Sequence, residues 1–204
     1  MSVFRWTAPL FKMAGRRWSE DDFHVVAERL RPFVSTDGVF VDLGGGTGDL
    51  GAGVARHLGA RVVIVDPTPQ MLARVPAQPL VSVRLATAQA LPFPDAYFDA
   101  VLCSDAFHHF RDQDAAVCEI KRAVRPGGGV LLLEFDGAGR ARLLAMVERL
   151  VGEPAAFKTA AEMQDYFVSH GIIGTSASEN GSSYSFLGCV PLPGAEPPSV
   201  KRVR

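Results

Sequence analysis

Short apolar segments alternate with amphipathic helical segments through the middle of this chain, from Val39 to Phe135. The apolar segments are rich in valine, isoleucine and leucine, as in Arg61–Asp66. Strands this apolar, each followed by a helix, are typical of a parallel sheet that helices cover on both faces. The alternation therefore predicts an α/β fold built on a doubly wound, mostly parallel sheet.

The residue pattern places each expected element. We expect seven strands, at Val39–Val41, Arg61–Asp66, Val81–Leu85, Phe98–Cys103, Val130–Phe135, Ile172–Ser176 and Tyr184–Val190. Helices are expected at Leu50–Leu58, Gln70–Val75, Gln113–Val124 and Ala141–Val151, with a turn at Arg125–Gly129. Asn180–Gly181 is a hairpin signal, so an antiparallel strand is expected near the C-terminus.

Capping residues mark two further helices. Ser19 precedes three acidic residues and the apolar spacing of a buried helical face, which predicts a helix that starts there. Thr159 and Glu162 have the spacing of a capping box. We expect one domain over residues 1–190, with residues 1–35 as a helical cap segment and residues 191–204 as a disordered tail.

Composition limits the classes of partner. The 204 residues are 48% hydrophobic, enough for one substantial core. A net charge of -1 offers no basic excess for phosphates, so we expect a small-molecule partner and no nucleic acid. The three cysteines have no metal-ligand spacing, and no apolar run approaches the ~20 residues of a membrane span. These features predict a cytoplasmic protein without a metal; the oligomeric state stays open.

A glycine-rich turn, Val41–Gly48, lies between the first expected strand and its helix. This order directs backbone N–H groups toward a ligand at the carboxyl edge of the sheet. Gly46, Gly48 and Gly51 also fit the dinucleotide fingerprint, and Asp66 follows 20 residues after Gly46. The turn alone therefore leaves two cofactors open, a nicotinamide dinucleotide and S-adenosylmethionine.

Two aspartates help to separate these cofactors. Asp42 carries an acid just before the first glycine, where it would repel a pyrophosphate but could face the ammonium group of a methionine moiety. Asp66 could accept hydrogen bonds from both ribose hydroxyls. This pair favours S-adenosylmethionine.

Four ordered blocks carry a family resemblance. They are Val41–Gly48 (VDLGGGTG), Asp66–Leu72 (DPTPQML), Ala88–Asp99 (AQALPFPDAYFD) and Arg125–Gly129 (RPGGG). In these blocks the chain resembles the class I S-adenosylmethionine-dependent methyltransferases, especially the ubiquinone/menaquinone-biosynthesis-like group. The resemblance covers about Val39 to Phe135 and implies the Rossmann-like methyltransferase fold, with S-adenosylhomocysteine as the product of the cofactor.

The resemblance also implies roles for individual residues. Those that would hold the methionine part are Asp42, Gly44, Gly46 and Gly48, with Ser104 near its carboxylate or near the substrate. Asp66 would hold the ribose, and the residues around the adenine would be Pro67, Met71, Thr87, Ala88 and Gln89. Many relatives have an aspartate where this chain has Thr87, so we expect weaker recognition of the adenine amino group.

Methyl transfer to a nucleophile requires alignment and exclusion of water, and a base only where the acceptor must lose a proton. His108, His109 and Glu134 lie near the carboxyl edge of the expected sheet and are the catalytic candidates. Each could instead be structural. Trp6, Phe11 and Trp18 could form a lid, or could simply plug the edge of the core.

Three functions remain open. The first is methyl transfer to a small acceptor, for which a phenolic or quinone-like compound fits the resemblance. The second is S-adenosylmethionine binding without catalysis. The third is an NAD(P)-dependent oxidoreductase, which would need a hydride-transfer set such as Tyr-x-x-x-Lys, and the sequence has no such set.

Overall fold

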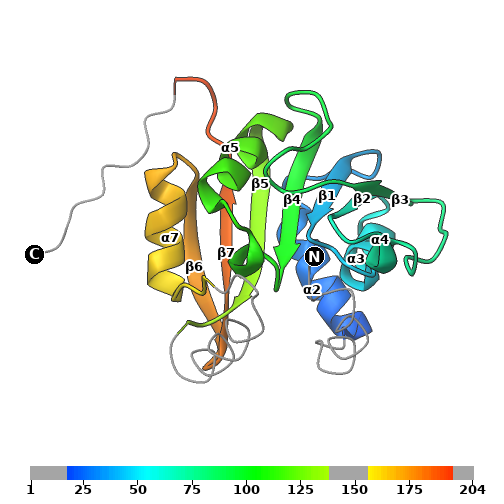
Figure 1. Cartoon of the computed structure of the whole chain (residues 1–204), viewed down its shortest axis with the longest axis horizontal. Helices are drawn as coiled ribbons and strands as arrows, with labels where there is room; N and C mark the ends of the chain where they lie inside the picture. Colours follow the sequence, from blue (N-terminus) through cyan, green and yellow to red (C-terminus); the bar gives the residue numbers. More distant parts are fainter. Residues whose placement is uncertain (1–17, 138–155, 195–204) are drawn as a thin grey trace, which may run out of the picture.

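The computed structural model describes residues 18–137 and 156–194 and shows a seven-stranded sheet (Figure 1). The strand order is β3-β2-β1-β4-β5-β7-β6. The strands are β1 (Val39–Leu43), β2 (Arg61–Asp66), β3 (Val81–Leu85), β4 (Phe98–Ser104), β5 (Val124–Phe135), β6 (Ile173–Asn180) and β7 (Ser183–Cys189). The pairs from β3 to β5 are parallel, and β7 runs antiparallel to both β5 and β6. The predicted fold, including its antiparallel strand near the C-terminus, is confirmed.

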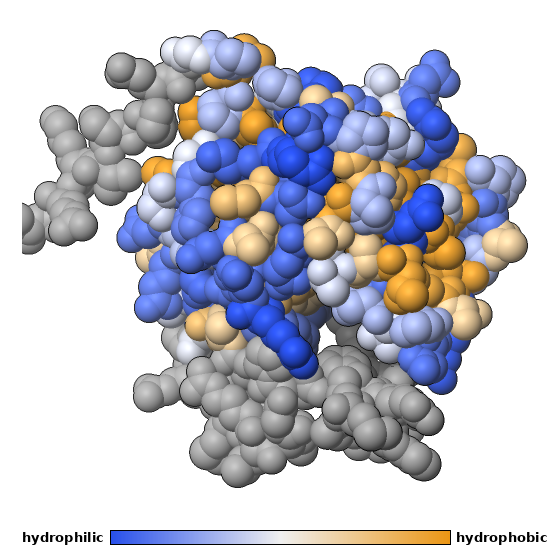
Figure 2. All heavy atoms as spheres, turned by 45° about the horizontal axis from the view of Figure 1, so that its top comes forward, coloured by the Kyte–Doolittle hydropathy of each residue, from blue (hydrophilic) through white to orange (hydrophobic). Residues whose placement is uncertain are grey.

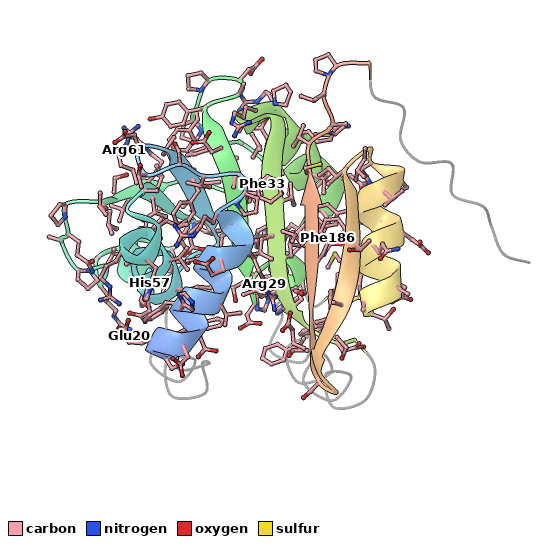
Figure 3. The ribbon with its side chains drawn as sticks, turned by 180° about the vertical axis from the view of Figure 1, so that it is seen from behind. Glu20, Arg29, Phe33, His57, Arg61 and Phe186 are labelled. Atoms are coloured by element: carbon pink, nitrogen blue, oxygen red, sulfur yellow. The ribbon has the colours of Figure 1, made fainter. Side chains whose placement is uncertain are left out.

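Helices cover both faces of the sheet (Figures 1 and 3). They are α2 (Glu20–Leu30), α3 (Asp49–Leu58), α4 (Pro69–Leu72), α5 (Gln113–Ala123) and α7 (Ala160–Ser169), with a 3₁₀ turn, η1, at Phe107–His109. Alternate strand residues face opposite sides, so the core has two parts. Val62 and Ile64 pack with α2 and α3, whereas Val63 and Val65 belong to the part that contains α5 and α7.

The predicted helix starts at Ser19 and Thr159 are confirmed. The Ser19 hydroxyl accepts a hydrogen bond from the Asp22 amide at 3.2 Å, and the Ser19 amide donates to the Asp22 carboxylate at 2.9 Å. Thr159 and Glu162 form the same reciprocal capping box at α7. Each box satisfies two amides that a helix start would leave without a partner.

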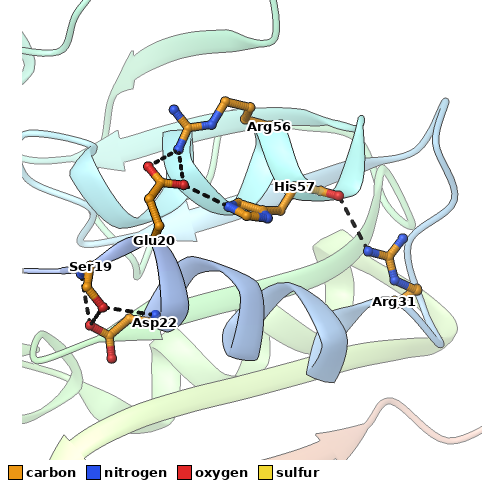
Figure 4. A network of polar contacts seen from close by, with 6 residues as sticks. All are labelled: Ser19, Glu20, Asp22, Arg31, Arg56 and His57. Carbon is orange, nitrogen blue, oxygen red and sulfur yellow. Dashed lines mark hydrogen bonds and ion pairs between the residues drawn. The ribbon is translucent and has the colours of Figure 1, made fainter.

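Helices α2 and α3 are also joined by a charged contact (Figure 4). Glu20 in the first turn of α2 accepts from Arg56 at 2.7 Å and lies 3.1 Å from the His57 ring. Both partners come from the last turn of α3. The contact therefore holds the start of one helix against the end of the other.

The segment Arg125–Gly129, predicted as a turn before a strand at Val130–Phe135, instead lies within β5. Strand β5 begins at Val124, and its register with β4 shifts between Phe98, which pairs with Val124, and Ala100, which pairs with Gly129. Gly127 has φ 76° and donates to the Val190 carbonyl at 2.7 Å. The segment bends within the span of the strand because the glycine conformation lets the chain leave the ladder and rejoin it.

Strand β3 forms one edge of the sheet and is the least covered strand. Val83 and Leu85 are 48% and 56% exposed. Residues 86–97 join β3 to β4 without a helix, which explains the missing cover. Figure 2 shows apolar residues gathered on the side of the molecule where β3 lies.

Several predictions fall outside the described residues. These are the helix at Ala141–Val151, the aromatic side chains Trp6 and Phe11, and most of the tail over residues 191–204. Within the described ranges, none of the helices is long and apolar enough to cross a membrane.

Candidate active site

The glycine turn, residues 44–48, follows β1 at the carboxyl edge of the sheet and is fixed to β2. The amides of Gly44 and Gly45 both donate to the Val65 carbonyl, at 2.8 and 3.2 Å. Gly44, Gly46 and Gly48 have φ of 74°, 55° and 74°. This is the left-handed region that side chains disfavour, so the turn depends on its glycines.

Asp66 at the end of β2 lies directly beside this turn. One carboxylate oxygen accepts from the Gly46 amide at 3.1 Å, and the other accepts from the Thr68 amide at 2.8 Å. Burial raises the pKa of Asp66, and the amides of Thr68 and Gly46 oppose that shift. Since each carboxylate oxygen can accept more than one hydrogen bond, Asp66 can hold the turn and also accept ligand hydroxyls.

Asp42 is near the turn but lies beneath it. Its side chain is 2% exposed, and its carboxylate accepts from the Gly51 amide in the first turn of α3 at 3.1 Å. Burial raises the pKa of Asp42 to about 7, and the negative charge of Asp66 adds to the shift. The structure thus places Asp42 under the start of α3, where it supports the glycine turn from below.

The residues expected around the adenine lie in different surroundings. A Cβ atom placed on Gly46 would lie 3.4 Å from the methyl carbon of Met71, so Met71 borders the turn directly. Pro67 and Thr87 are exposed, and Ala88 is part of the core. The Gln89 side chain donates to the Asp112 carbonyl at 3.3 Å. The structure thus brings Met71 and Asp66 to the turn, and it directs Gln89 toward the start of α5.

Ser104 ends β4, the next strand along this edge. Its hydroxyl oxygen is buried and finds no hydrogen-bond partner among residues 18–137 and 156–194. A buried hydroxyl without a partner costs free energy unless something supplies one. Ser104 is therefore well suited to a polar group of a ligand that reaches the end of β4.

Glu134, His108 and His109 lie close together near the ends of β4 and β5. Glu134, near the end of β5, is 2% exposed and lies 2.6 Å from the His108 ring nitrogen Nδ1. His108 is itself buried between the rings of His109 and Phe157, each with its centroid 4.0 Å away. His109 is only half-buried. The structure therefore separates the two histidines by environment.

Sequence reasoning missed three residues of this region. Asp105 has φ 49°, the left-handed conformation, at the end of β4. Ala106 follows it and approaches Gly44 so closely that a Cβ atom on Gly44 would lie 2.5 Å from the Ala106 Cβ. Tyr184 on β7, paired with Glu134, has a buried hydroxyl that lacks a partner among the described residues. Burial and the charge of Glu134 raise its pKa. None of these positions carries a sequence motif.

The residues present fit S-adenosylmethionine. The left-handed glycines let a ligand approach the backbone, Asp66 has acceptor capacity for ribose hydroxyls, and the Ser104 hydroxyl lacks a partner in the described chain. Among the described residues, no three His, Cys, Asp or Glu side chains gather closely enough to hold a metal ion.

Comparison with known proteins supports the same cofactor. Residues 41–132 match the family model described as a methyltransferase domain. The ubiquinone/menaquinone biosynthesis C-methyltransferase UbiE of Serratia proteamaculans is 30% identical over 174 residues, 72% of this chain and 69% of the relative. UbiE of Cupriavidus metallidurans is 38% identical over 104 residues, 47% of this chain and 42% of the relative, so in that match the chain spans less than half of the relative's length.

The fold has counterparts among solved structures. In a complex between the Haloferax volcanii Trm112 methyltransferase activator and a methyltransferase, one chain superposes with a TM-score of 0.75. The match is 18% identical and covers 94% of this chain and 99% of that one. At this identity the likeness shows the fold alone. The identity to the Serratia relative, together with the matching domain model, establishes that this chain belongs to the class I S-adenosylmethionine-dependent methyltransferases.

Proposed function

We propose that this chain transfers the methyl group of S-adenosylmethionine to a small-molecule acceptor. The observation that carries the proposal is the contact between Asp66 and Gly46, at 3.1 Å, because it joins an acceptor carboxylate to a left-handed glycine turn at the carboxyl edge of the sheet. A ligand with a ribose and an amino-acid end fits such a pair. The related domain model and the UbiE relatives support the same chemistry.

The bound cofactor supplies a methyl group on a positively charged sulfur, which a nucleophile can take by in-line displacement. The residues of the protein then bind and orient the cofactor. Asp66 and the glycine turn hold it, Met71 lies against the turn, and the Ser104 hydroxyl is available to it at the end of β4. Alignment of the acceptor with the methyl group lowers the barrier without a chemical step by the protein.

A phenolic or quinone-like acceptor is part of this proposal. It rests on the similarity to UbiE, which is named for ubiquinone and menaquinone biosynthesis. A phenol must lose its proton during transfer, and His108 or His109 is our candidate for the base. We also keep the cytoplasmic location as a proposal, since Cys103, Cys118 and Cys189 are all free thiols.

Calorimetry with S-adenosylhomocysteine tests the cofactor site. We expect the wild-type protein to bind it and Asp66→Asn to bind at least tenfold more weakly, about 1.4 kcal/mol. Asp37→Asn is the matched control, because Asp37 is exposed and distant from the turn in the fold. Unchanged affinity in Asp66→Asn would remove Asp66 from the site. Thermal stabilisation by NADH but not by S-adenosylhomocysteine would favour the oxidoreductase instead.

Catalysis requires a separate test. The protein is incubated with S-adenosylmethionine labelled in the methyl group and with panels of phenols, quinols, amines and thiols. We expect label in at least one phenolic or quinol product. Label only in amines or thiols would overturn the proposed acceptor class, and no product from any panel despite cofactor binding would favour a binding protein without catalysis.

A further inference from the structure

The chain turns sharply after β4, over residues 105–109, and the carboxylate of Glu134 holds this turn. One oxygen of Glu134 accepts from the Ala106 amide at 3.1 Å and from the Phe107 amide at 2.7 Å. The other oxygen lies 2.6 Å from His108 Nδ1. Three consecutive residues of the turn are therefore bound to a single side chain.

The turn needs such an anchor because its backbone is strained. Asp105 has φ 49°, a conformation that a residue with a side chain keeps only when its surroundings impose it. Its amide donates to the Leu133 carbonyl at 2.9 Å, next to Glu134 on β5. The end of β5 thus fixes the turn through one backbone carbonyl and one carboxylate.

The same turn touches the cofactor side of the edge. Gly44 is so near that an added Cβ would meet the Ala106 Cβ at 2.5 Å and the Phe110 ring at 3.6 Å. Any shift of Ala106 toward β1 would therefore push on Gly44. A shift away from β1 would remove the packing contact between Ala106 and Gly44.

We propose that Glu134 is a positioning residue, which sets the shape of the cofactor site by holding the turn after β4 against Gly44. The proposal rests on the proposed function, since it takes the glycine turn as the cofactor site. Glu134 does not need to touch the cofactor or the acceptor. Both of its oxygens already have donors, and its side chain is 2% exposed.

The primary test compares Glu134→Ala with Glu134→Gln, with calorimetry of S-adenosylhomocysteine binding as the readout. The alanine variant frees the Ala106 and Phe107 amides, so we expect at least tenfold weaker binding. The glutamine variant keeps an oxygen for these amides, so we expect an affinity within about threefold of wild type. Its side-chain amide must donate to His108 Nδ1, so nitrogen NMR should show the proton of that ring move to Nε2.

Asp99→Ala is the matched control. The Asp99 carboxylate also joins neighbouring segments, but it lies at the amino ends of the strands, away from the glycine turn. It accepts from the Val39 amide at 2.9 Å and from Arg125 at 2.7 Å. We expect this variant to lose stability yet to bind S-adenosylhomocysteine like the wild type. An equal loss of affinity in both alanine variants would reduce Glu134 to a general stabiliser and overturn the proposal.

Ala106→Val approaches the same contact from the other side and tests it even if Glu134→Ala does not fold. With Glu134 intact, the added methyl groups should press on Gly44 and weaken S-adenosylhomocysteine binding at least tenfold. If folded Ala106→Val or folded Glu134→Ala binds S-adenosylhomocysteine with wild-type affinity, the role of Glu134 is overturned, whereas the proposed function still stands. If the wild-type protein itself does not bind S-adenosylhomocysteine, the proposed function fails first, so the two failures are distinguishable.

Discussion

Two aspartates at one sheet edge differ because their surroundings differ. Asp66 meets the glycine turn and has two amide donors, whereas Asp42 is buried beneath α3 with the Gly51 amide. A Cβ atom on Gly51 would lie 2.5 Å from the Asp42 carboxylate, so α3 packs closely against this side chain. Of the two acids that the sequence pattern associates with a ligand, Asp42 is thus the more deeply buried.

The buried position of Asp42 should make stability depend on pH. Its pKa is about 7 in the folded protein and has its ordinary value, 3.8, when unfolded. Between these values the folded state binds a proton that the unfolded state releases, so the free energy of unfolding falls as pH rises from about 4 to 7. Asp42→Asn should remove most of that fall, on the order of 2 kcal/mol or more.

Urea unfolding at several pH values between 4 and 7.5 measures this effect. Asp37→Asn, at an exposed site, should keep the slope of the wild type. An Asp42→Asn protein with an unaltered slope would show that another group causes the dependence.

Gly44 allows a prediction that concerns both geometry and binding. Gly44→Ala forces a side chain into φ 74° and places its Cβ 2.5 Å from that of Ala106. We expect a destabilisation of about 1–3 kcal/mol and a loss of S-adenosylhomocysteine affinity of at least tenfold. Gly181→Ala is the control, because a Cβ there would meet nothing within 4 Å. Calorimetry of both variants measures the affinity for S-adenosylhomocysteine, and urea unfolding measures their stability.

At the scale of elements, the capped starts of two helices were predictable and some other bounds were not: the helix predicted at Gln70–Val75 ends at Leu72. Ser19 and Thr159 start helices as expected because a cap is a local interaction, complete within a few residues. Strand β5 instead begins at Val124, because Val124 already pairs with Phe98 of β4 before the register shifts and pairing resumes at Gly129. That pairing depends on a neighbouring strand, which local sequence patterns do not contain.

The residues of the candidate site also fall into a predictable group and an unpredictable group. Asp66 and the glycines were predictable because a strand followed by a glycine turn has a characteristic spacing. Ala106 and the anchoring contacts of Glu134 were not, because they depend on how β4 and β5 end relative to each other. An alanine offers no chemistry to a sequence pattern, and a lone glutamate does not reveal its partners.

The cap of α2 gives a prediction for a single element. Ser19→Ala removes the hydroxyl that accepts from the Asp22 amide, and the Ser19 amide keeps its contact with the Asp22 carboxylate. We expect a loss of about 1 kcal/mol in the free energy of unfolding. Ser178→Ala, at an exposed serine of β6, should change it by less than about 0.5 kcal/mol. Equal effects in urea unfolding would contradict a capping role for Ser19.

At the scale of the whole molecule, an ion pair links segments that are far apart in the chain. Arg29 on α2 (labelled in Figure 3) donates through both terminal nitrogens to Glu179 on β6, and the longer of the two contacts is 3.0 Å. The two side chains are 28% and 26% exposed. The first helix that the structure describes is thereby tied to the far edge strand of the sheet.

A double-mutant cycle with Arg29→Ala and Glu179→Ala measures this link. We expect a coupling of about 0.5–1 kcal/mol, at the upper end for a surface pair because the contact uses two nitrogens. Added salt should reduce it, since the pair is partly exposed. No coupling at low salt would show that α2 and β6 are held together by other contacts.

The sparsely covered edge strand β3 should make the two edges of the sheet differ in their resistance to opening. Its opposite edge, β6, packs against α7 and carries the ion pair to α2, whereas β3 pairs with β2 alone within the described chain, touches the short helix α4 and leaves Val83 and Leu85 about half exposed. Backbone amides on such an edge exchange their hydrogens with water before those of the central strands. We therefore expect hydrogen exchange to begin at β3 and to reach β2, with Asp66 at its end, before β1 and β4.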